Sequence, residues 1–365
     1  MTPTTIEPTL AADEPLTRLD HYRLLGRSGL RVSPLCLGAM TFGTGWGWGA
    51  DETTSRRLFD MYVDRGGNFI DTANMYTNGE SETMLGTFLQ DRRDRFVLAT
   101  KYTLSMDPTD PNAGGNHRKN LTHALEASLR RLKTDCIDLY WVHAWDERTP
   151  TEELMRALDD AVRAGKILYV GVSDFPAWKV AQANTLAELR GWSPFIALQI
   201  EFSLVQRTVE RDLIPMAREF NLGVTPWSPL GGGVLTGKYS RKDLEALDDQ
   251  ERRQSEEGGR AVKLTERKIR IVEALMDVAA EIGRPAAQVA LNWLIQKPGV
   301  VSPIIGARKP EQLEDNLACL DFALEEEHLR KLDEASEIEL GFPHDFLQRD
   351  GIRQIRDGET TIAYP

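Results

Sequence analysis

Residues 68–76 read NFIDTANMY, a short apolar run that ends in a carboxylate and is followed by a tyrosine. The chain contains eight such apolar, often β-branched runs, at residues 34–38, 68–71, 96–101, 137–143, 168–173, 195–200, 222–227 and 300–305. They are apolar nearly throughout, which is typical of parallel strands covered on both faces. Amphipathic helical patterns lie between them, and one begins at Thr149 and Pro150 and ends at Gly165. Eight successive units predict an α/β fold, a single closed (β/α)8 barrel of the TIM type.

Three segments depart from this alternation. Residues 22–34 hold two short extended runs about a Ser-Gly turn and predict an N-terminal hairpin that plugs the barrel floor. Residues 231–259 begin with glycines and become charge-dense, as long functional or disordered loops do. Two helical patterns, residues 264–282 and 285–296, precede the eighth run, so one helix is extra to the barrel.

The chain therefore divides into three parts. We expect a flexible tail over residues 1–20, one barrel domain over 21–340, and a C-terminal substrate loop and tail over 341–365. The last part begins within LGFPHDFL at residues 340–347, whose two phenylalanines are unusual so near a chain end.

Composition narrows the classes of protein. The 365 residues are 41% hydrophobic, enough for a sizeable core, and 44 basic against 56 acidic side chains give a net charge of −12. This balance argues against binding of nucleic acid, which needs a basic face. No apolar run approaches the roughly 20 residues of a membrane span. The three cysteines, Cys36, Cys136 and Cys319, have no metal-ligand spacing, and the N-terminus lacks a signal peptide. We expect a cytoplasmic protein without a metal, whose oligomeric state is open.

In such a barrel, chemistry takes place where the strands end. Asp71 ends the second run and is followed by Tyr76, Lys101 ends the third, and His143 ends the fourth. Taken singly, these could be a turn cap, a packing tyrosine, a surface lysine and a core histidine. Together they would converge on one rim, where a buried lysine needs a carboxylate partner.

This set of side chains favours proton transfer. A free phenol has a pKa of about 10, and an ammonium held by a carboxylate would lower it. A histidine on the other side could orient a carbonyl oxygen. Reduction of a carbonyl, with a proton delivered as the carbon accepts hydride, is the reaction that fits.

Asp71, Tyr76, Lys101 and His143 resemble the catalytic tetrad of the aldo-keto reductases. The resemblance extends over about residues 22–336 and includes LGAMTFG (37–43), GVSD (171–174), TPWSPLGGGVLTGKY (225–239) and PIIGARKPEQLEDN (303–316). It implies an NADPH-dependent carbonyl reductase, of bacterial type. Tyr76 would be the proton donor, Lys101 and Asp71 its pKa-lowering pair, and His143 the group that orients the substrate.

The resemblance also implies a set of NADPH contacts. Ser173, Asp174 and Gln199 would hold the nicotinamide carboxamide, although the family commonly has asparagine where this chain has Asp174, and a carboxylate cannot donate a hydrogen bond. Trp227 would stack on the nicotinamide ring. The remaining contacts are Ser228, Leu230, Gly232 and Lys238 at the pyrophosphate, and Gly306, Arg308, Gln312 and Asn316 at the adenosine and its 2′-phosphate.

The loop after the first run carries Phe42, Trp46 and Trp48, which we expect to wall an apolar substrate pocket, unless the tryptophans only pack the loop. Residues 45–50 also fit G-x-G-x-x-A, the fingerprint of a Rossmann domain. Two indoles in a turn that must approach a pyrophosphate closely, and eight strands in place of six, argue against that fold.

Residues 105–119 are a second candidate substrate wall. Their last members, His117, Arg118 and Lys119, could instead begin the next helix, and the sequence leaves both interpretations open.

Two classes of function remain. The first is a carbonyl reductase that acts on a small-molecule aldehyde or ketone. The second is an NADP-binding regulatory subunit, because the potassium-channel β-subunits resemble this family and use the barrel as a binding module. The presence of all four tetrad residues favours catalysis.

Overall fold

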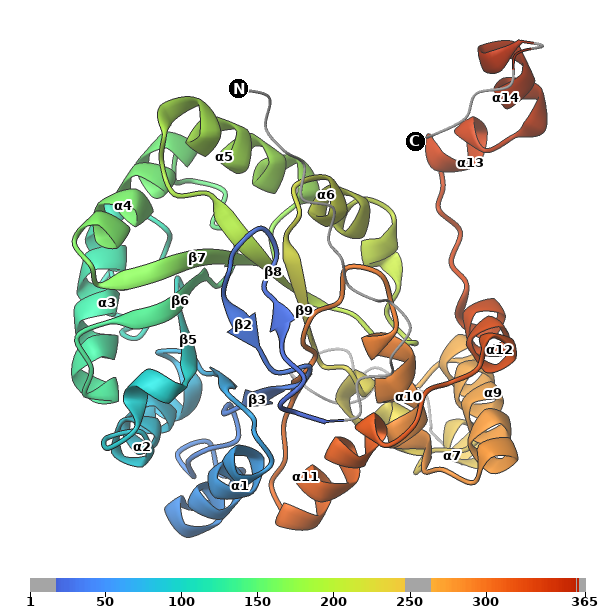
Figure 1. Cartoon of the computed structure of the whole chain (residues 1–365), viewed down its shortest axis with the longest axis horizontal. Coiled ribbons are helices and arrows are strands. Elements are labelled where there is room, and N and C mark those ends of the chain that lie inside the picture. Colours follow the sequence, from blue (N-terminus) through green and yellow to red (C-terminus); the bar gives the residue numbers. More distant parts are fainter. Residues whose placement is uncertain (1–17, 247–263, 359, 361–365) are drawn as a thin grey trace.

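The computed structural model describes residues 18–246, 264–358 and 360. Its main sheet has eight parallel strands in the order β10-β3-β4-β5-β6-β7-β8-β9, and a parallel bridge from Val224 to Val300 joins the two edges into a barrel (Figure 1). The strands are β3 (Cys36–Gly38), β4 (Phe69–Asp71), β5 (Val97–Tyr102), β6 (Ile137–Val142), β7 (Ile167–Ser173), β8 (Phe195–Glu201), β9 (Gly223–Trp227) and β10 (Ile304–Ile305). Each overlaps one of the eight predicted runs, and the predicted (β/α)8 barrel is confirmed.

Helices surround the barrel (Figure 1). They are α1 (Glu52–Asp64), α2 (Glu80–Phe88), α3 (Arg118–Leu132), α4 (Thr151–Arg163), α5 (Ala177–Arg190), α6 (Leu213–Glu219), α7 (Arg241–Ala246), α9 (Glu266–Ile282), α10 (Ala286–Ile295), α11 (Pro310–Leu317) and α12 (Glu326–Ser336). Short 3-10 turns occur at η1 (Tyr76–Gly79), η2 (Arg93–Arg95), η3 (Thr208–Glu210), η4 (Gly231–Thr236) and η5 (Ala318–Leu320). Both predicted helices, α9 and α10, lie between β9 and β10, and the short α7 precedes them, so the described residues hold more helices there than one βα unit needs.

The predicted hairpin closes the barrel floor. Its strands β1 (Arg23–Leu24) and β2 (Arg31–Val32) pair antiparallel. Leu25 and Val32 are buried in the apolar cluster inside the barrel. Gly26 has a φ of 58°, and a Cβ there would lie 2.2 Å from the Ile196 carbonyl oxygen, so the turn packs against the start of β8 as only glycine allows. The floor is sealed, and a ligand must enter from the opposite rim.

The C-terminal segment leaves the barrel. The helices α13 (His344–Leu347) and α14 (Asp350–Asp357) extend away from it beyond α12 (Figure 1). Phe342 is 85% exposed, and His344 Nε2 lies 3.4 Å from Asp212 Oδ1 beside α6. The structure thus does not bring these residues to the tetrad, and their role as a substrate loop stays a prediction.

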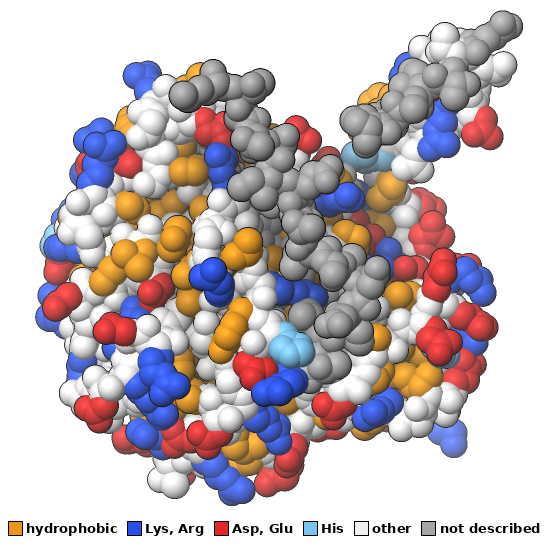
Figure 2. Space-filling model, in the orientation of Figure 1, with side chains coloured by type: hydrophobic (Ala, Val, Ile, Leu, Met, Phe, Trp, Pro, Cys, Tyr) orange, Lys and Arg blue, Asp and Glu red, His pale blue; other side chains and the backbone are white. Residues whose placement is uncertain are grey.

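Some expectations fall outside the described residues. The flexible tail over residues 1–20 is described only from residue 18, and the loop over residues 231–259 only to residue 246, where η4 and α7 occupy it. None of the described helices has the length and apolar character that crossing a membrane requires. Acidic and basic side chains alternate over the face with the hairpin (Figure 2).

Candidate active site

The ends of neighbouring strands bring the predicted tetrad together. Asp71 is the last residue of β4, Lys101 lies near the end of β5, and His143 directly follows β6. These strands are adjacent in the barrel, so the three side chains meet at the rim opposite the hairpin. Tyr76 begins the turn between β4 and α2 and reaches the same place.

Lys101 is the centre of the hydrogen-bond network. Its side chain is fully buried, and its Nζ forms an ion pair with Asp71 Oδ2. Nζ also donates to the Thr72 carbonyl oxygen at 2.8 Å and to the Tyr76 hydroxyl at 3.3 Å. Gln199 Nε2 donates to the other Asp71 oxygen at 3.1 Å. The ammonium of Lys101 has three N–H donors. The oxygens of Asp71, Thr72 and Tyr76 accept one hydrogen bond each, which compensates the burial of the charge.

The pKa of the Tyr76 phenol differs from the simple expectation. Burial raises it above the ordinary value, while the positive charge of Lys101 opposes that rise. The net direction is upward because removal of water penalises the phenolate. Lys101 therefore limits a rise in this pKa rather than bringing it below that of a free phenol. Tyr76 is consequently protonated at neutral pH, as a proton donor must be.

For Lys101, burial lowers the pKa of the ammonium. The carboxylate of Asp71 and the Tyr76 phenol more than offset this effect, so the net shift of the pKa is upward. The lysine keeps its charge beside the phenol at neutral pH.

His143 faces the tyrosine from the other side. The two rings are edge-on with centroids 6.1 Å apart. Burial and the charge of Lys101 lower the pKa of His143 to about 3, so the imidazole is neutral at physiological pH. Its Nδ1 is buried without a hydrogen-bond partner among the described residues. A neutral ring has one N–H donor and one acceptor, which suits it to hold a carbonyl oxygen.

The residues expected at the nicotinamide lie on the same rim, at the ends of β7, β8 and β9. Ser173 Oγ is buried and, within the described residues, has no hydrogen-bond partner. Trp227 Nε1 donates to Asp174 Oδ1 at 3.1 Å. Asp174 as a residue is exposed, but neighbouring groups shield its carboxyl from water, and this burial raises the pKa of the carboxyl. A carboxamide could satisfy the orphaned serine, and this observation supports a nicotinamide site.

The residues expected at the pyrophosphate form a glycine turn after β9. Gly231, Gly232 and Gly233 all have positive φ, and Gly232 N donates to Ser228 Oγ at 3.1 Å. Lys238 Nζ lies 3.2 Å from where a Cβ of Gly233 would be, so its ammonium folds over this turn. The N–H groups of Gly231 and Gly233 also donate within the turn, to the Ser228 and Leu230 carbonyl oxygens at 2.8 and 3.0 Å, so the ammonium of Lys238 is the group here that suits a phosphate. Leu230 is half-buried at its start.

The expected adenosine residues follow β10. Arg308 and Gln312 are exposed, and Gln312 Oε1 accepts from the Arg308 backbone N–H at 3.0 Å, which leaves the guanidinium side chain outside this bond. Asn316 lies one turn further along α11 and is buried. Gly306 is exposed at the end of β10. The donor set fits a phosphorylated ribose.

The structure separates the three aromatic residues of the expected substrate wall. Phe42 is 1% exposed and packs edge-on against Phe88, with centroids 6.3 Å apart, so it is a core residue and does not face a pocket. Trp46 and Trp48 are half-buried and pack against each other at 5.6 Å. Trp46 also lies edge-on to Tyr76 at 6.3 Å. Trp46 thus borders the Tyr76 phenol, and Trp48 packs behind Trp46.

The second candidate wall resolves differently. His117 is the N-cap of α3, and its ring accepts from the Asn120 backbone N–H at 3.3 Å. Arg118 forms an ion pair of 2.7 Å with Asp160, and Lys119 lies within α3. The structure therefore favours the interpretation in which these residues begin the helix.

Sequence reasoning missed the buried Asn116, which joins two rim loops. Its backbone N–H donates to Asp146 at 2.7 Å and its side chain donates to the Ala144 carbonyl oxygen at 2.8 Å. Thr103 donates to its side-chain oxygen at 2.6 Å, and the His143 N–H donates to the Thr103 hydroxyl at 3.2 Å. In the sequence, Asn116 looks like any asparagine that forms a turn in a glycine-rich loop, so no local pattern predicts that it joins two loops.

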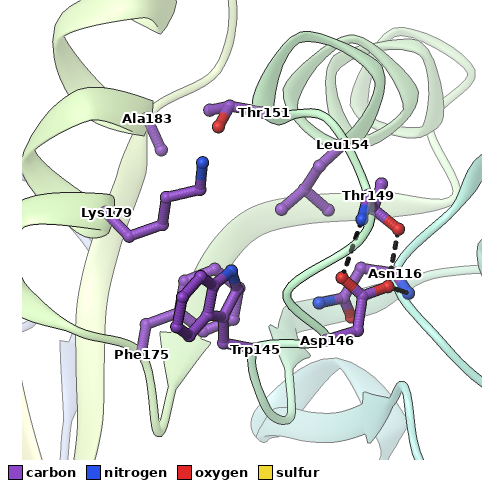
Figure 3. A pocket seen from close by; sticks show the side chains of 9 residues that line it. All are labelled: Asn116, Trp145, Asp146, Thr149, Thr151, Leu154, Phe175, Lys179 and Ala183. Atoms are coloured by element: carbon purple, nitrogen blue, oxygen red, sulfur yellow. Dashed lines mark hydrogen bonds between the residues drawn. The ribbon is translucent and has the colours of Figure 1, made fainter.

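Asn116 and Asp146 border a cavity of about 10 Å³ together with Trp145 and Lys179 (Figure 3). That volume suits at most one water molecule. A larger open hollow of about 690 Å³ lies outside the barrel between α5 and α6. Neither lining includes a tetrad residue, so the candidate active site rests on the geometry of the side chains.

Comparison with known proteins agrees with this geometry. Residues 34–337 match the model of the Aldo/keto reductase family. The chain therefore belongs to the aldo-keto reductase family. It is an oxidoreductase of the carbonyl–alcohol class, in a family that generally uses NAD(P)H.

Its relatives include a fungal reductase and fungal aryl-alcohol dehydrogenases. The chain is 39% identical to the norsolorinic acid reductase of Aspergillus flavus, over 96% of this chain and 90% of that protein. It is 39% identical to the aryl-alcohol dehydrogenase [NADP(+)] of Phanerodontia chrysosporium, over 91% and 90%. It is 37% identical to a putative aryl-alcohol dehydrogenase of Saccharomyces cerevisiae, over 92% of each. These relatives are fungal, and they give no support to the bacterial type expected from the sequence.

Proposed function

We propose that the protein reduces aromatic aldehydes or ketones to alcohols with NADPH, and that Tyr76 donates the proton. The observation that carries the proposal is the position of Lys101, which bridges Asp71 and the Tyr76 hydroxyl beside a neutral His143. The relatives named for aryl alcohols, and the Trp46 indole beside Tyr76 with Trp48 packed against it, support an aromatic substrate.

NADPH, when bound, supplies the hydride that the carbonyl carbon accepts. Ser173 and Gln199 would hold its carboxamide, Trp227 would stack on its ring, and the turn over residues 231–233 with Lys238 would hold its pyrophosphate. Arg308 would grip the 2′-phosphate with charge-assisted hydrogen bonds.

The chain's own groups manage the proton. The neutral His143 ring donates to the carbonyl oxygen and directs it toward Tyr76. The phenol then gives its proton to that oxygen as negative charge develops there. The ammonium of Lys101 stabilises the phenolate left behind, and Asp71 holds the ammonium in place. In the direction of alcohol oxidation the same phenolate accepts the proton.

A screen of NADPH oxidation tests this proposal. The purified protein is mixed with NADPH and an aromatic aldehyde, an aromatic ketone or a short aliphatic aldehyde, and the decrease in NADPH absorbance is followed. We expect turnover, with a higher kcat/KM for the aromatic compounds. Tight NADPH binding without turnover of any carbonyl would instead indicate the regulatory class.

A further inference from the structure

The loop that carries the two indoles is held by a carboxylate that neither the tetrad nor the NADPH contacts include. Glu80 is the first residue of α2, four residues after Tyr76. Its Oε2 accepts from the backbone N–H of Thr44 at 3.0 Å and from that of Gly45 at 3.1 Å. Hydrogen bonds from N–H groups to an ionised acceptor are the stronger kind.

The backbone around this contact is built for close approach. Thr77 and Asn78 have φ values of 47° and 57°, and Gly79 has a φ of 90°. Three successive left-handed residues are costly in a chain of L-amino acids, except at glycine. They turn the chain so that α2 begins directly beneath the indole loop.

The base of the loop is tightly packed at Gly43 and Gly49. A Cβ at Gly43 would lie 2.5 Å from Glu80 Oε2, and a Cβ at Gly49 would lie 2.2 Å from the Gly43 carbonyl oxygen. The Thr77 hydroxyl donates to the Phe42 carbonyl oxygen at 2.8 Å. The turn that follows Tyr76 therefore holds the indole loop at two points, Thr77 and Glu80.

Trp46 follows directly after the N–H groups that Glu80 binds, and its ring meets the ring of Tyr76. The position of the indole relative to the catalytic phenol thus depends on a carboxylate carried by the same short turn as that phenol. Loss of the carboxylate would leave the N–H groups of Thr44 and Gly45 without their acceptor and loosen the tip of the loop, whose base stays closed by the hydrogen bond from Gly43 N to the Ala50 carbonyl oxygen at 2.9 Å. The network of Lys101 would stay in place, because Glu80 is not part of that network.

We propose that Glu80 is a positioning residue that fixes Trp46 and Trp48 as an aromatic wall beside Tyr76, and that this wall selects flat aromatic carbonyl substrates over small aliphatic ones. The proposal rests on the proposed function and adds the residue that sets its selectivity. A flat ring lies against an indole face with favourable stacking, whereas a short alkyl chain gains little from it.

The first part of the test is kinetic. In Glu80→Ala, kcat/KM for a naphthyl aldehyde should decrease by about tenfold, mainly through KM, because the loss of one or two charge-assisted hydrogen bonds is of that order. For propanal the decrease should be at most about threefold, since it gains little from stacking on the wall. Glu80→Gln keeps an acceptor and should lie between. Glu326→Gln changes an exposed carboxylate in the first turn of α12. It is the matched control and should leave kcat/KM unchanged for both substrates.

The second part separates positioning from folding. In a double-mutant cycle with Trp46→Ala, the Glu80→Ala change should have almost no further effect on the naphthyl aldehyde, because the wall is already gone. Full additivity of the two losses, or an equal loss with propanal, would overturn the proposal.

The third part does not need turnover. Hydrogen–deuterium exchange of residues 42–50 should become faster in Glu80→Ala than in Glu326→Gln, since Thr44 and Gly45 lose their acceptor. Unchanged exchange would overturn the role of Glu80 even if the enzyme is active. A wild-type protein that reduces neither aldehyde, yet shows the faster exchange in the variant, would refute the proposed function and leave the contact of Glu80 with the loop intact.

Discussion

Replacement of Lys101 by methionine gives a quantitative test of the buried ion pair. The change leaves the carboxylate of Asp71 buried without its ammonium, and such a loss typically costs about 3–5 kcal/mol in free energy of unfolding. The melting temperature should therefore fall by several degrees. The double variant Lys101→Met/Asp71→Asn removes both charges, and we expect it to recover most of that loss.

The same variants separate stability from chemistry. Without the ammonium, the opposing effect of Lys101 on Tyr76 is lost and the pKa of the phenol rises further. Alcohol oxidation requires the phenolate, so its rate in both variants should be low and should increase only at higher pH than in the wild type. We therefore expect the double variant to regain most of its melting temperature while its rate of alcohol oxidation stays impaired.

The assays are thermal unfolding followed by circular dichroism and a pH–rate profile of alcohol oxidation on the same preparations. Lys331→Met, which removes a half-buried surface lysine paired with Glu281, is the control and should change neither quantity appreciably. A double variant no more stable than Lys101→Met, or an unchanged pH–rate profile, would refute the reasoning.

The remaining predictions concern His143, the cofactor and the clamp. The pKa of His143 in the folded protein, about 3, lies below its ordinary value of 6.5, so the unfolded chain binds more protons between these two pH values and the free energy of unfolding should fall as pH drops from about 6.5 toward 3. The melting temperature of His143→Ala should depend less on pH, and the variant should reduce carbonyls poorly. Normal specific activity of this variant would show that His143 is only a core residue. Arg308→Ala should weaken NADPH binding by at least about tenfold and leave NADH nearly unchanged, as measured by quenching of tryptophan fluorescence; equal affinities of the unmutated protein for both cofactors would contradict the 2′-phosphate site. Asp174→Asn should strengthen NADPH binding by a few-fold, since the amide can donate as well as accept, and weaker binding would show that the carboxylate itself is required by Trp227.

The barrel and the tetrad were open to prediction because their signals are local. Strands buried on both faces are apolar throughout, and polar residues at their ends stand out, as Asp71, Lys101 and His143 do. The hairpin also has a local signal, since a Ser-Gly turn lies between two extended runs. In a parallel barrel the C-terminal ends of all strands meet at one rim, so these local signals also define a site.

Other features depend on contacts between distant segments, which no single window contains. The sequence predicts that Phe42 lies on the rim, in one loop with two tryptophans, but the chain turns back and its ring packs on Phe88 of α2. The upward shift in the pKa of Tyr76 depends on burial, which the residue types do not give. Glu80 resembles any acidic residue in a first helical turn, and only the fold brings it to the loop of Trp46.

The central claim is that Tyr76 donates the proton in an NADPH-dependent reduction. Its most direct test is the rate of NADPH oxidation with an aromatic aldehyde, measured for the wild type and Tyr76→Phe alongside the NADPH dissociation constant of each. Loss of a general acid typically costs about 10²–10⁴-fold, so we predict a decrease in kcat of that size with NADPH affinity almost unchanged. A Tyr76→Phe variant that retained more than about a tenth of the wild-type kcat would contradict the claim.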